Sequence, residues 1–199
     1  MNILQINTSI RGDQSHSTRI ANSLVARLRA LQPAAHAQIL DLAQQPPLTL
    51  DAAALEALGT PAAQRSAVQA GRVAADDALI AELMAADIVV LGVPMYNFAV
   101  PVQLKSWIDA IGRAGVTFRY DENGPHGLVQ GKKVFIVLSR GGRYRDTEAD
   151  SQVPYLKTAL GFLGMTDITW IYAEGLNMGE ESQRQTLTEI AAQIAAITL

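Results

Sequence analysis

The segment from Asp87 to Pro94 constrains the fold more than any other part of the sequence. It reads Asp-Ile-Val-Val-Leu-Gly-Val-Pro, an apolar run without alternation between polar and apolar positions. A strand of this kind is covered on both faces, as a central strand of a parallel sheet is. A second continuous apolar strand is predicted at 133–138. The chain is therefore expected to build a parallel sheet between layers of helices.

Segments with helical periodicity alternate with such strands along the whole chain. Ile20, Leu24, Leu28 and Leu31 recur at helical spacing, which predicts one buried helix face that ends before Pro33. The other predicted elements are strands at 3–6, 36–40 and 167–172, and helices from Asp51, after Pro61, after Pro101, at 153–163 and at 187–197. Five strands alternating with helices predict one doubly wound α/β domain over residues 1–199, which binds ligands beyond the carboxyl ends of its strands.

The composition excludes several classes of protein. The net charge is −3, and the Lys and Arg residues between 113 and 157 are interspersed with acids, so we interpret them as loop and surface charge and expect no nucleic-acid partner. The chain has no cysteine, which excludes disulfides and a cysteine nucleophile. Its three histidines are scattered, so no metal site is expected. Neither a signal peptide nor a run of about 18 apolar residues is visible, which favours a cytoplasmic protein without a membrane anchor.

The first candidate ligand loop follows the first predicted strand. Ser9, Ser15, Ser17 and Thr18 bring four hydroxyl groups to a helix N-terminus, where free N–H groups and the helix dipole favour a phosphate. The simpler alternative is that Ser15 or Ser17 only caps the helix. The loop lacks the glycine-rich dinucleotide fingerprint and the Walker lysine, so a lone terminal phosphate is favoured. His16 lies in this loop, and we expect its backbone N–H to matter more than its ring.

The second candidate loop follows the strand at 87–94. It carries Met95, Tyr96, Asn97 and Phe98 between two prolines. An exposed loop of this composition predicts a flat apolar partner stacked against aromatic and polarizable groups. The alternative is that Phe98 plugs the core beneath the loop.

The third candidate loop is Ser139-Arg140-Gly141-Gly142, which follows the strand at 133–138. Two successive glycines let a ligand approach the backbone closely, although an ordinary tight turn also explains them. The three loops lie at one edge of the expected sheet. Their combination predicts a ligand site better than any one of them does.

These stretches resemble the FMN-dependent NADH-azoreductases, which are also NADH:quinone reductases of the flavodoxin-like superfamily. The likeness spans essentially the whole chain, and its matching residues are Ser9, 15–17, 94–98, 113–120, 122–125, 127–128, 131–133 and 139–142. The resemblance implies a flavodoxin-like, three-layer, doubly wound sheet of five parallel strands and a homodimer. It implies bound FMN held by Ser9, Ser15, His16, Ser17, Met95, Tyr96, Asn97, Phe98, Ser139, Arg140, Gly141 and Gly142.

The same resemblance implies an activity. Quinones and azo dyes are the expected acceptors, nitroaromatics are a further candidate, and NADH or NADPH is the hydride donor in a two-electron ping-pong reaction. No side chain is expected to act as a nucleophile or general acid. Tyr120 and Phe162 are implied to line the substrate pocket from the partner subunit, with a core position as the alternative for Phe162. Residues 143–150 depart from the family pattern, which leaves the substrate range open.

Two other classes of function stay open. A flavodoxin-type electron carrier would bind FMN and pass single electrons to proteins, but such carriers use a markedly acidic face for steering, and a net charge of −3 is weak. A flavin-binding regulatory module would show no turnover at all.

Overall fold

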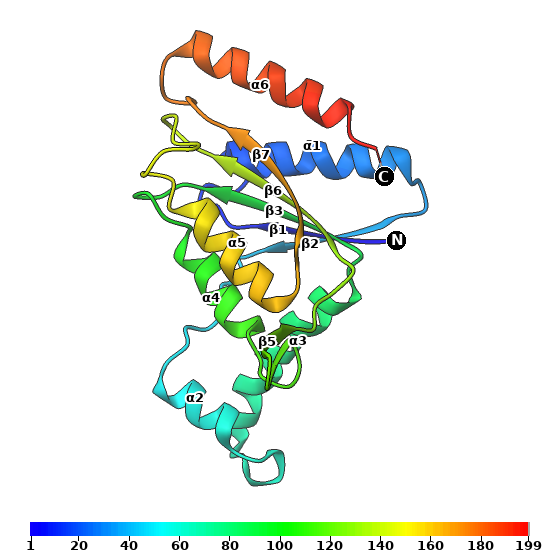
Figure 1. Cartoon of the computed structure of the whole chain (residues 1–199), viewed down its shortest axis with the longest axis vertical. Helices are drawn as coiled ribbons and strands as arrows, with labels where there is room; N and C mark the ends of the chain where they lie inside the picture. Colours follow the sequence, from blue (N-terminus) through cyan, green and yellow to red (C-terminus); the bar gives the residue numbers. More distant parts are fainter. Residues whose placement is uncertain (199) are drawn as a thin grey trace.

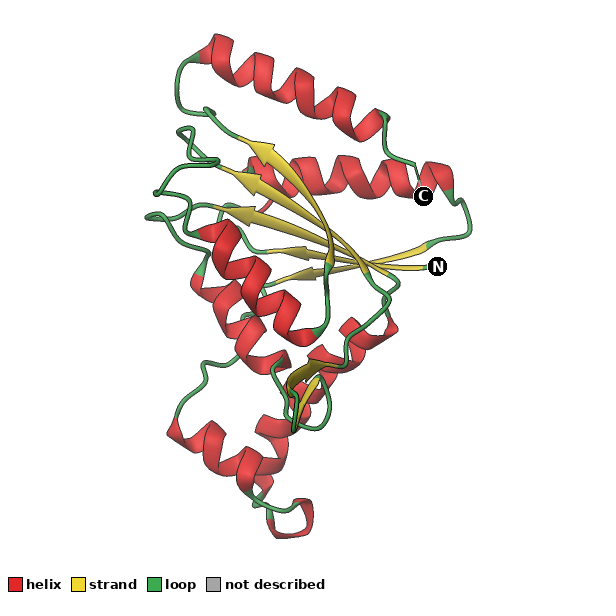
Figure 2. Cartoon of the chain, in the orientation of Figure 1, coloured by secondary structure: helices red, strands yellow, loops and turns green. Residues whose placement is uncertain are grey.

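Five parallel strands form the central sheet of the computed structural model, which describes residues 1–198. The strand order is β2-β1-β3-β6-β7. The strands are β1 (Asn2–Asn7), β2 (His36–Asp41), β3 (Ile88–Pro94), β6 (Lys133–Ser139) and β7 (Asp167–Ala173). All their arrowheads point to the same side in Figure 2, so the carboxyl ends form one edge. The predicted doubly wound sheet of five parallel strands is confirmed.

Helices cover both faces of this sheet. They are α1 (His16–Leu31), α2 (Ala52–Gly59), α3 (Ala67–Ala85), α4 (Val102–Ile111), α5 (Gln152–Leu163) and α6 (Glu180–Ala195), with short 3₁₀ helices η1 (Gly12–Gln14) and η2 (Ala62–Gln64). In Figure 1, α1 and α6 lie on one face and α4 and α5 on the other, while α2 lies farthest from the sheet. The predicted three layers are therefore present.

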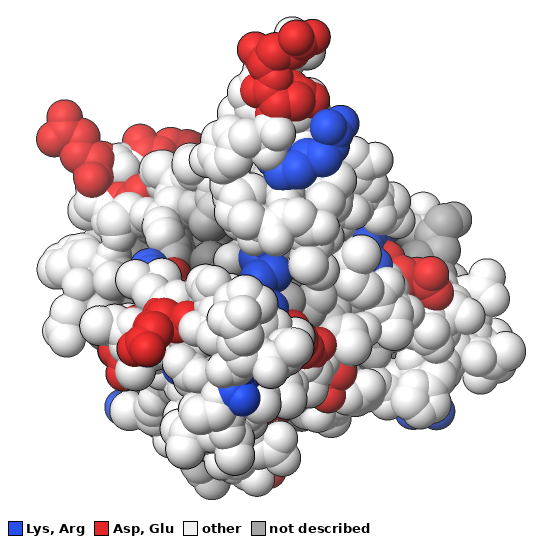
Figure 3. All heavy atoms as spheres, turned by 90° about the horizontal axis from the view of Figure 1, so that it is seen from below, with Lys and Arg blue, Asp and Glu red and all other residues white. Residues whose placement is uncertain are grey.

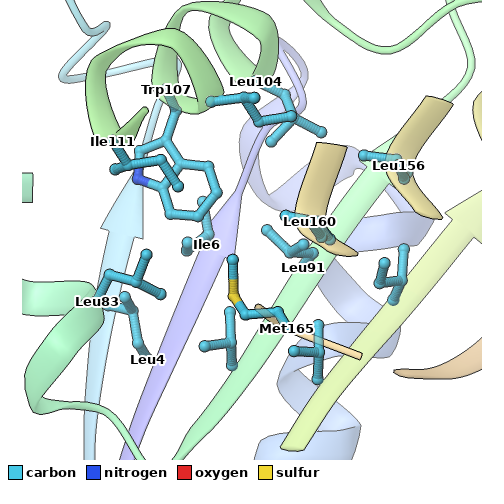
Figure 4. Packing of buried hydrophobic residues seen from close by; sticks show 14 of the residues in the cluster. Leu4, Ile6, Leu83, Leu91, Leu104, Trp107, Ile111, Leu156, Leu160 and Met165 are labelled. Carbon is cyan, nitrogen blue, oxygen red and sulfur yellow. The ribbon is translucent and has the colours of Figure 1, made fainter. Parts of the chain in front are cut away.

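Each face of the sheet has its own core. All seven residues of β3 are buried, as expected for a central strand. On one face Trp107 of α4 lies fully buried above the sheet near Ile6, with Leu91 and Met165 nearby in the same core (Figure 4). On the other face Leu24 of α1 belongs to the second core. Burying one such side chain stabilises the fold by roughly 1.5–3 kcal/mol.

The structure differs from the predicted elements in three places, one of which is the last helix, which spans Glu180–Ala195 instead of 187–197. Strands β4 (Phe118–Asp121) and β5 (Gly124–Gly127) form an antiparallel hairpin that the sequence pattern did not predict, because such short strands carry no apolar alternation. The helix expected directly after Pro61 begins at Ala67 instead. Ser66 and Gln69 form a capping box there, whereas Pro61 precedes η2.

The order of the strands places a ligand crevice beside β1. The chain passes from β1 to β2 on one side and returns to β3 on the other, so the strand order reverses between β1 and β3. Doubly wound sheets bind ligands at this point, beyond the carboxyl ends of the strands. The loops after β1, β3 and β6 all start at this edge.

The surface charge, the helices and the possible metal ligands each bear on another kind of binding. Figure 3 shows acidic and basic residues interspersed over the face seen from below, with wide uncharged areas between them. Within residues 1–198, no helix combines the length and apolar character that a bilayer span requires. The same residues contain no cluster of three or more His, Asp or Glu side chains that could hold a metal ion.

Candidate functional site

A cavity of about 230 Å³ opens at the carboxyl edge of the sheet, between the three predicted loops. Eight of the twelve residues predicted to bind the cofactor line it: Ser9, Ser15, His16, Met95, Tyr96, Ser139, Arg140 and Gly141. The other four, Ser17, Asn97, Phe98 and Gly142, lie within two positions of these residues in the chain. The structure therefore brings together three segments that are far apart in the sequence, and their contacts with a cofactor stay a prediction.

The first loop leaves the N-terminus of α1 open to a ligand. Ser15 occupies the capping position, but its hydroxyl lies 2.9 Å from the hydroxyl of Ser17 and caps no backbone N–H. The backbone N–H groups of His16, Ser17 and Thr18 donate to no acceptor in residues 1–198. The hydroxyl of Thr18 is buried without a partner as well. The capping alternative is therefore wrong, and the unpaired donors favour an anion at this helix end.

The ring of His16 is engaged elsewhere. Its Nε2 lies 3.0 Å from the amide Nε2 of Gln183 on α6. Burial, together with the charges of Arg19 and Arg11, lowers the pKa of His16, which favours a neutral ring. The geometry agrees with the expectation that the backbone of His16, rather than its side chain, serves the loop.

The second loop contains a strained turn. Tyr96 and Ala99 exchange backbone hydrogen bonds of 3.1 and 3.0 Å, and between them Asn97 and Phe98 have φ of +49° and +64°. A left-handed conformation costs a phenylalanine roughly 1–2 kcal/mol and persists where the surroundings enforce it, often at functional sites. The N–H groups of Asn97 and Phe98 find no acceptor in the described chain. The left-handed conformation and the unpaired N–H groups together indicate that this turn presents hydrogen-bond donors.

Phe98 does not plug the core. Its residue surface is 55% exposed, so that alternative is wrong. The turn is held from behind by α5: the amide of Gln152 donates to Pro94 O at 3.0 Å and to Ala99 O at 3.3 Å, and Ser151 donates to Phe98 O. Strain in the loop is thus maintained by contacts at both ends.

The third loop is supported by a buried arginine. Arg140 is 1% exposed, so its interpretation as surface charge is wrong. Its guanidinium donates to both carboxylate oxygens of Asp150 at 2.7 and 3.0 Å, to Glu174 at 3.0 Å and to Gln152 at 3.1 Å. We call Arg140, Asp150, Gln152 and Glu174 the Arg140 network. Since Gln152 also holds the second loop, the network ties the second and third loops together.

The two glycines of the third loop have close side-chain neighbours. A Cβ on Gly141 would lie 2.7 Å from the side-chain amide of Asn177, and a Cβ on Gly142 would lie 2.7 Å from the Tyr144 hydroxyl. Both neighbouring atoms are the free ends of side chains, so an ordinary tight turn stays an alternative explanation for the two glycines. The N–H groups of both glycines donate to no acceptor in residues 1–198. These N–H groups lack an acceptor, as do the unpaired donors of the other two loops, and a bound ligand would supply one.

Asn177 is a lining residue that the sequence analysis missed. It lies in the segment after β7, and its N–H donates to Gly141 O at 3.0 Å. Its position beyond the carboxyl end of the fifth strand was the available signal, because all such loops meet at one edge.

Tyr120 and Phe162 lie apart from this cavity. Tyr120 is on the β4–β5 hairpin and 67% exposed, and its ring centroid is 6.3 Å from that of Phe162. Helix α5 starts at the carboxyl edge and runs back along the sheet, so Phe162 lies near the opposite edge (Figure 1). One chain does not bring these residues to its own cavity.

Comparison with known proteins decides the family. The family model described as flavodoxin-like fold matches residues 1–197. The FMN-dependent NADH:quinone oxidoreductase of Aromatoleum aromaticum is 61% identical over 98% of both chains, and that of Dechloromonas aromatica is 62% identical over 98% of both. The chain belongs to this family of flavodoxin-like oxidoreductases. An azoreductase structure from Bacillus anthracis superposes with a TM-score of 0.90 at 26% identity, covering 98% of this chain and 97% of the other. The resemblance drawn from the motifs is confirmed.

Proposed function

We propose that this chain binds FMN in the cavity between the three loops and reduces quinones and aromatic azo compounds with NADH or NADPH. One observation carries the proposal: all three loops that hold unpaired backbone donors line a single cavity. The names of the relatives from Aromatoleum aromaticum and Bacillus anthracis support both the cofactor and the two kinds of acceptor. When bound, FMN supplies the chemistry of hydride transfer.

The residues present fit FMN. The free N–H groups at His16, Ser17 and Thr18 suit the terminal phosphate, with the hydroxyls of Ser15 and Ser17 as further donors. Met95 and the exposed ring of Phe98 offer the apolar surface that a flat ring system needs. The fit therefore covers both the charged and the planar part of the cofactor.

The remaining donors serve the polar edges of the ring. We infer that the N–H groups of Asn97 and Phe98 bind one edge, and that those of Gly141 and Gly142 stabilise negative charge at another. Because these groups are fixed before any substrate arrives, they need no rearrangement during the reaction. No side chain is assigned as general acid or base.

A ping-pong reaction follows from one shared pocket. The nicotinamide and the acceptor would use the same face beside Phe98 in turn, so each must leave before the other binds. Parallel lines in double-reciprocal plots are the expected kinetic result.

The first test uses purified, FMN-loaded protein and a quinone, without any other protein. Steady oxidation of NADH is expected, because the chain holds both cofactor and acceptor sites. An electron carrier or a regulatory module would show no such turnover, and a protein that cannot retain or rebind FMN would contradict the central proposal. A panel of quinones, azo dyes and nitroaromatics with NADH and NADPH, compared as kcat/KM, then defines the substrate range.

We further propose a homodimer in the cytoplasm, in which Tyr120 and Phe162 of one copy line the pocket of the other. The exposed ring of Tyr120, which lies against Phe162 on the far side of the chain's own cavity, supports this assignment. Replacing Phe162 with alanine is expected to raise the KM for both substrates several-fold in a protein that still sediments as a dimer. Unaltered Michaelis constants would remove Phe162 from the pocket.

A further inference from the structure

Residues 143–150, where the chain departs from the family pattern, are fixed at both ends. The backbone N–H groups of Tyr144 and Arg145 both donate to one carboxylate oxygen of Glu174, at 2.8 and 3.0 Å. At the other end, Asp150 accepts two hydrogen bonds from the Arg140 guanidinium. The Arg140 network thus positions a segment that local hydrogen bonds alone would leave mobile.

The start of this segment holds Tyr144 between the second and third loops. Its ring meets the ring of Phe98 edge-on, with centroids 5.5 Å apart and planes at 72°. Its hydroxyl lies against the Cα of Gly142, where it fills the space that a Cβ would occupy. Tyr144 is therefore in contact with both loops that carry the unpaired N–H groups proposed to bind the ring.

The Tyr144 hydroxyl packs against Gly142 but has no hydrogen-bond partner in the described chain. Its backbone is held by Glu174, and the residue as a whole is partly buried. A fixed tyrosine with a free hydroxyl offers a flat apolar face together with one donor. Quinones, which are planar and carry carbonyl oxygens, match this combination.

We propose that Tyr144 determines which electron acceptors this chain uses, and this proposal rests on the proposed function. Its ring closes one side of the pocket beside Phe98 and limits the width of the acceptor. Its hydroxyl donates a hydrogen bond to an acceptor carbonyl oxygen. The Arg140 network holds this wall in place, so the selectivity is set before the acceptor binds.

Two variants separate the roles of the ring and the hydroxyl. Tyr144→Ala is expected to increase the kcat/KM of a three-ring quinone relative to a single-ring quinone about tenfold, since it removes the wall. Tyr144→Phe is expected to leave this ratio unchanged and to weaken quinone binding about two- to tenfold, the range for one lost hydrogen bond. The control is Glu148→Ala, because Glu148 is exposed in the same segment and makes no hydrogen bond or ion pair in residues 1–198.

A measurement without turnover completes the test. The dissociation constant of each quinone is measured on oxidised, FMN-loaded protein in the absence of a nicotinamide, alongside the dissociation constant of FMN itself. We expect FMN affinity to change less than about threefold in both variants, because none of the donors proposed for FMN belongs to Tyr144. If both variants keep the wild-type ratio and quinone affinities, or if they lose FMN instead, Tyr144 does not select the acceptor. Absence of turnover in the wild type would instead overturn the proposed function, and quinone binding would still report on Tyr144.

Discussion

Replacing Arg140 with methionine is expected to lower the free energy of unfolding by about 3–5 kcal/mol. The side chains of Asp150 and Glu174 are only 8% and 12% exposed, and both lose their cation in this variant. A buried carboxylate without a partner is costly, and removal of one member of a buried pair leaves that cost in place. Methionine keeps much of the length of the arginine, so the effect reports the lost charge and hydrogen bonds rather than a cavity.

The same variant is expected to bind FMN more weakly. Gln152 loses the guanidinium that orients it, and Gln152 holds the carbonyl groups of Pro94 and Ala99 at the strained turn. The second loop then lacks part of the support that keeps Phe98 in its left-handed conformation. Urea unfolding of the FMN-free protein and a separate FMN titration distinguish the two effects.

Arg184→Met is the matched control for Arg140→Met. Arg184 pairs with Glu181 at 2.6 Å on α6, but both side chains are more than 70% exposed, at 73% and 76%. Exposed pairs contribute about 0–1 kcal/mol, so the urea midpoint should barely move. Equal midpoints for the two variants would mean that the Arg140 network does not stabilise the fold.

Most of the fold could be predicted from the sequence because two neighbouring strands of the sheet, β3 and β6, are largely continuous apolar runs. Local sequence determines both the apolar run at 87–94 and the helical spacing from Ile20 to Leu31. The strand and the helix that these patterns predict are confirmed. The β4–β5 hairpin depends instead on packing. Gly127 of β5 lies against the end of α5, a contact between residues far apart in the sequence, and no local pattern indicates it.

The location of the candidate site could be predicted from the sequence, but the contacts that support its loops could not. The position of loops after parallel strands follows from topology, so the three segments could be placed together. The burial of Arg140 could not be predicted, because its partners come from Asp150, Gln152 and Glu174 in two other segments. An arginine in a polar loop is usually solvated, and only the tertiary structure shows the carboxylates that bury it.

The left-handed conformation at Asn97 and Phe98 could not be predicted from the sequence for a related reason. Phenylalanine disfavours positive φ, so local propensity predicts a different backbone conformation. The conformation follows from contacts made by Gln152 and Ser151, which lie more than fifty residues away in sequence. Sites where local preference is overruled by tertiary contacts are the ones where function is expected.

Gly127→Ala is expected to destabilise the protein by about 3 kcal/mol or more, at the upper end of the range for overpacking. A Cβ at this position would lie 2.1 Å from the backbone nitrogen of Gly164 and 2.3 Å from the carbonyl carbon of Leu163. Both are main-chain atoms, so no side-chain rotation relieves the clash. Hairpin and helix must separate, which for a chain of this size corresponds to a fall in Tm of roughly 6–12 °C.

Gly71→Ala provides the control that makes this prediction specific to close packing. A Cβ on Gly71, within α3, meets nothing within 4 Å, and alanine is the better helix former by about 1 kcal/mol, so this variant should be slightly stabilised.

The hairpin carries Tyr120, whose ring faces Phe162 at the end of α5, so separation at Gly127 also moves the proposed partner-side wall of the pocket. A Gly127→Ala protein with the wild-type Tm would show that β5 does not rest on α5, and an altered KM at unchanged Tm would assign Gly127 to the pocket alone. Loss of stability together with a raised KM is the expected result, because one backbone contact supports both the hairpin and the aromatic pair.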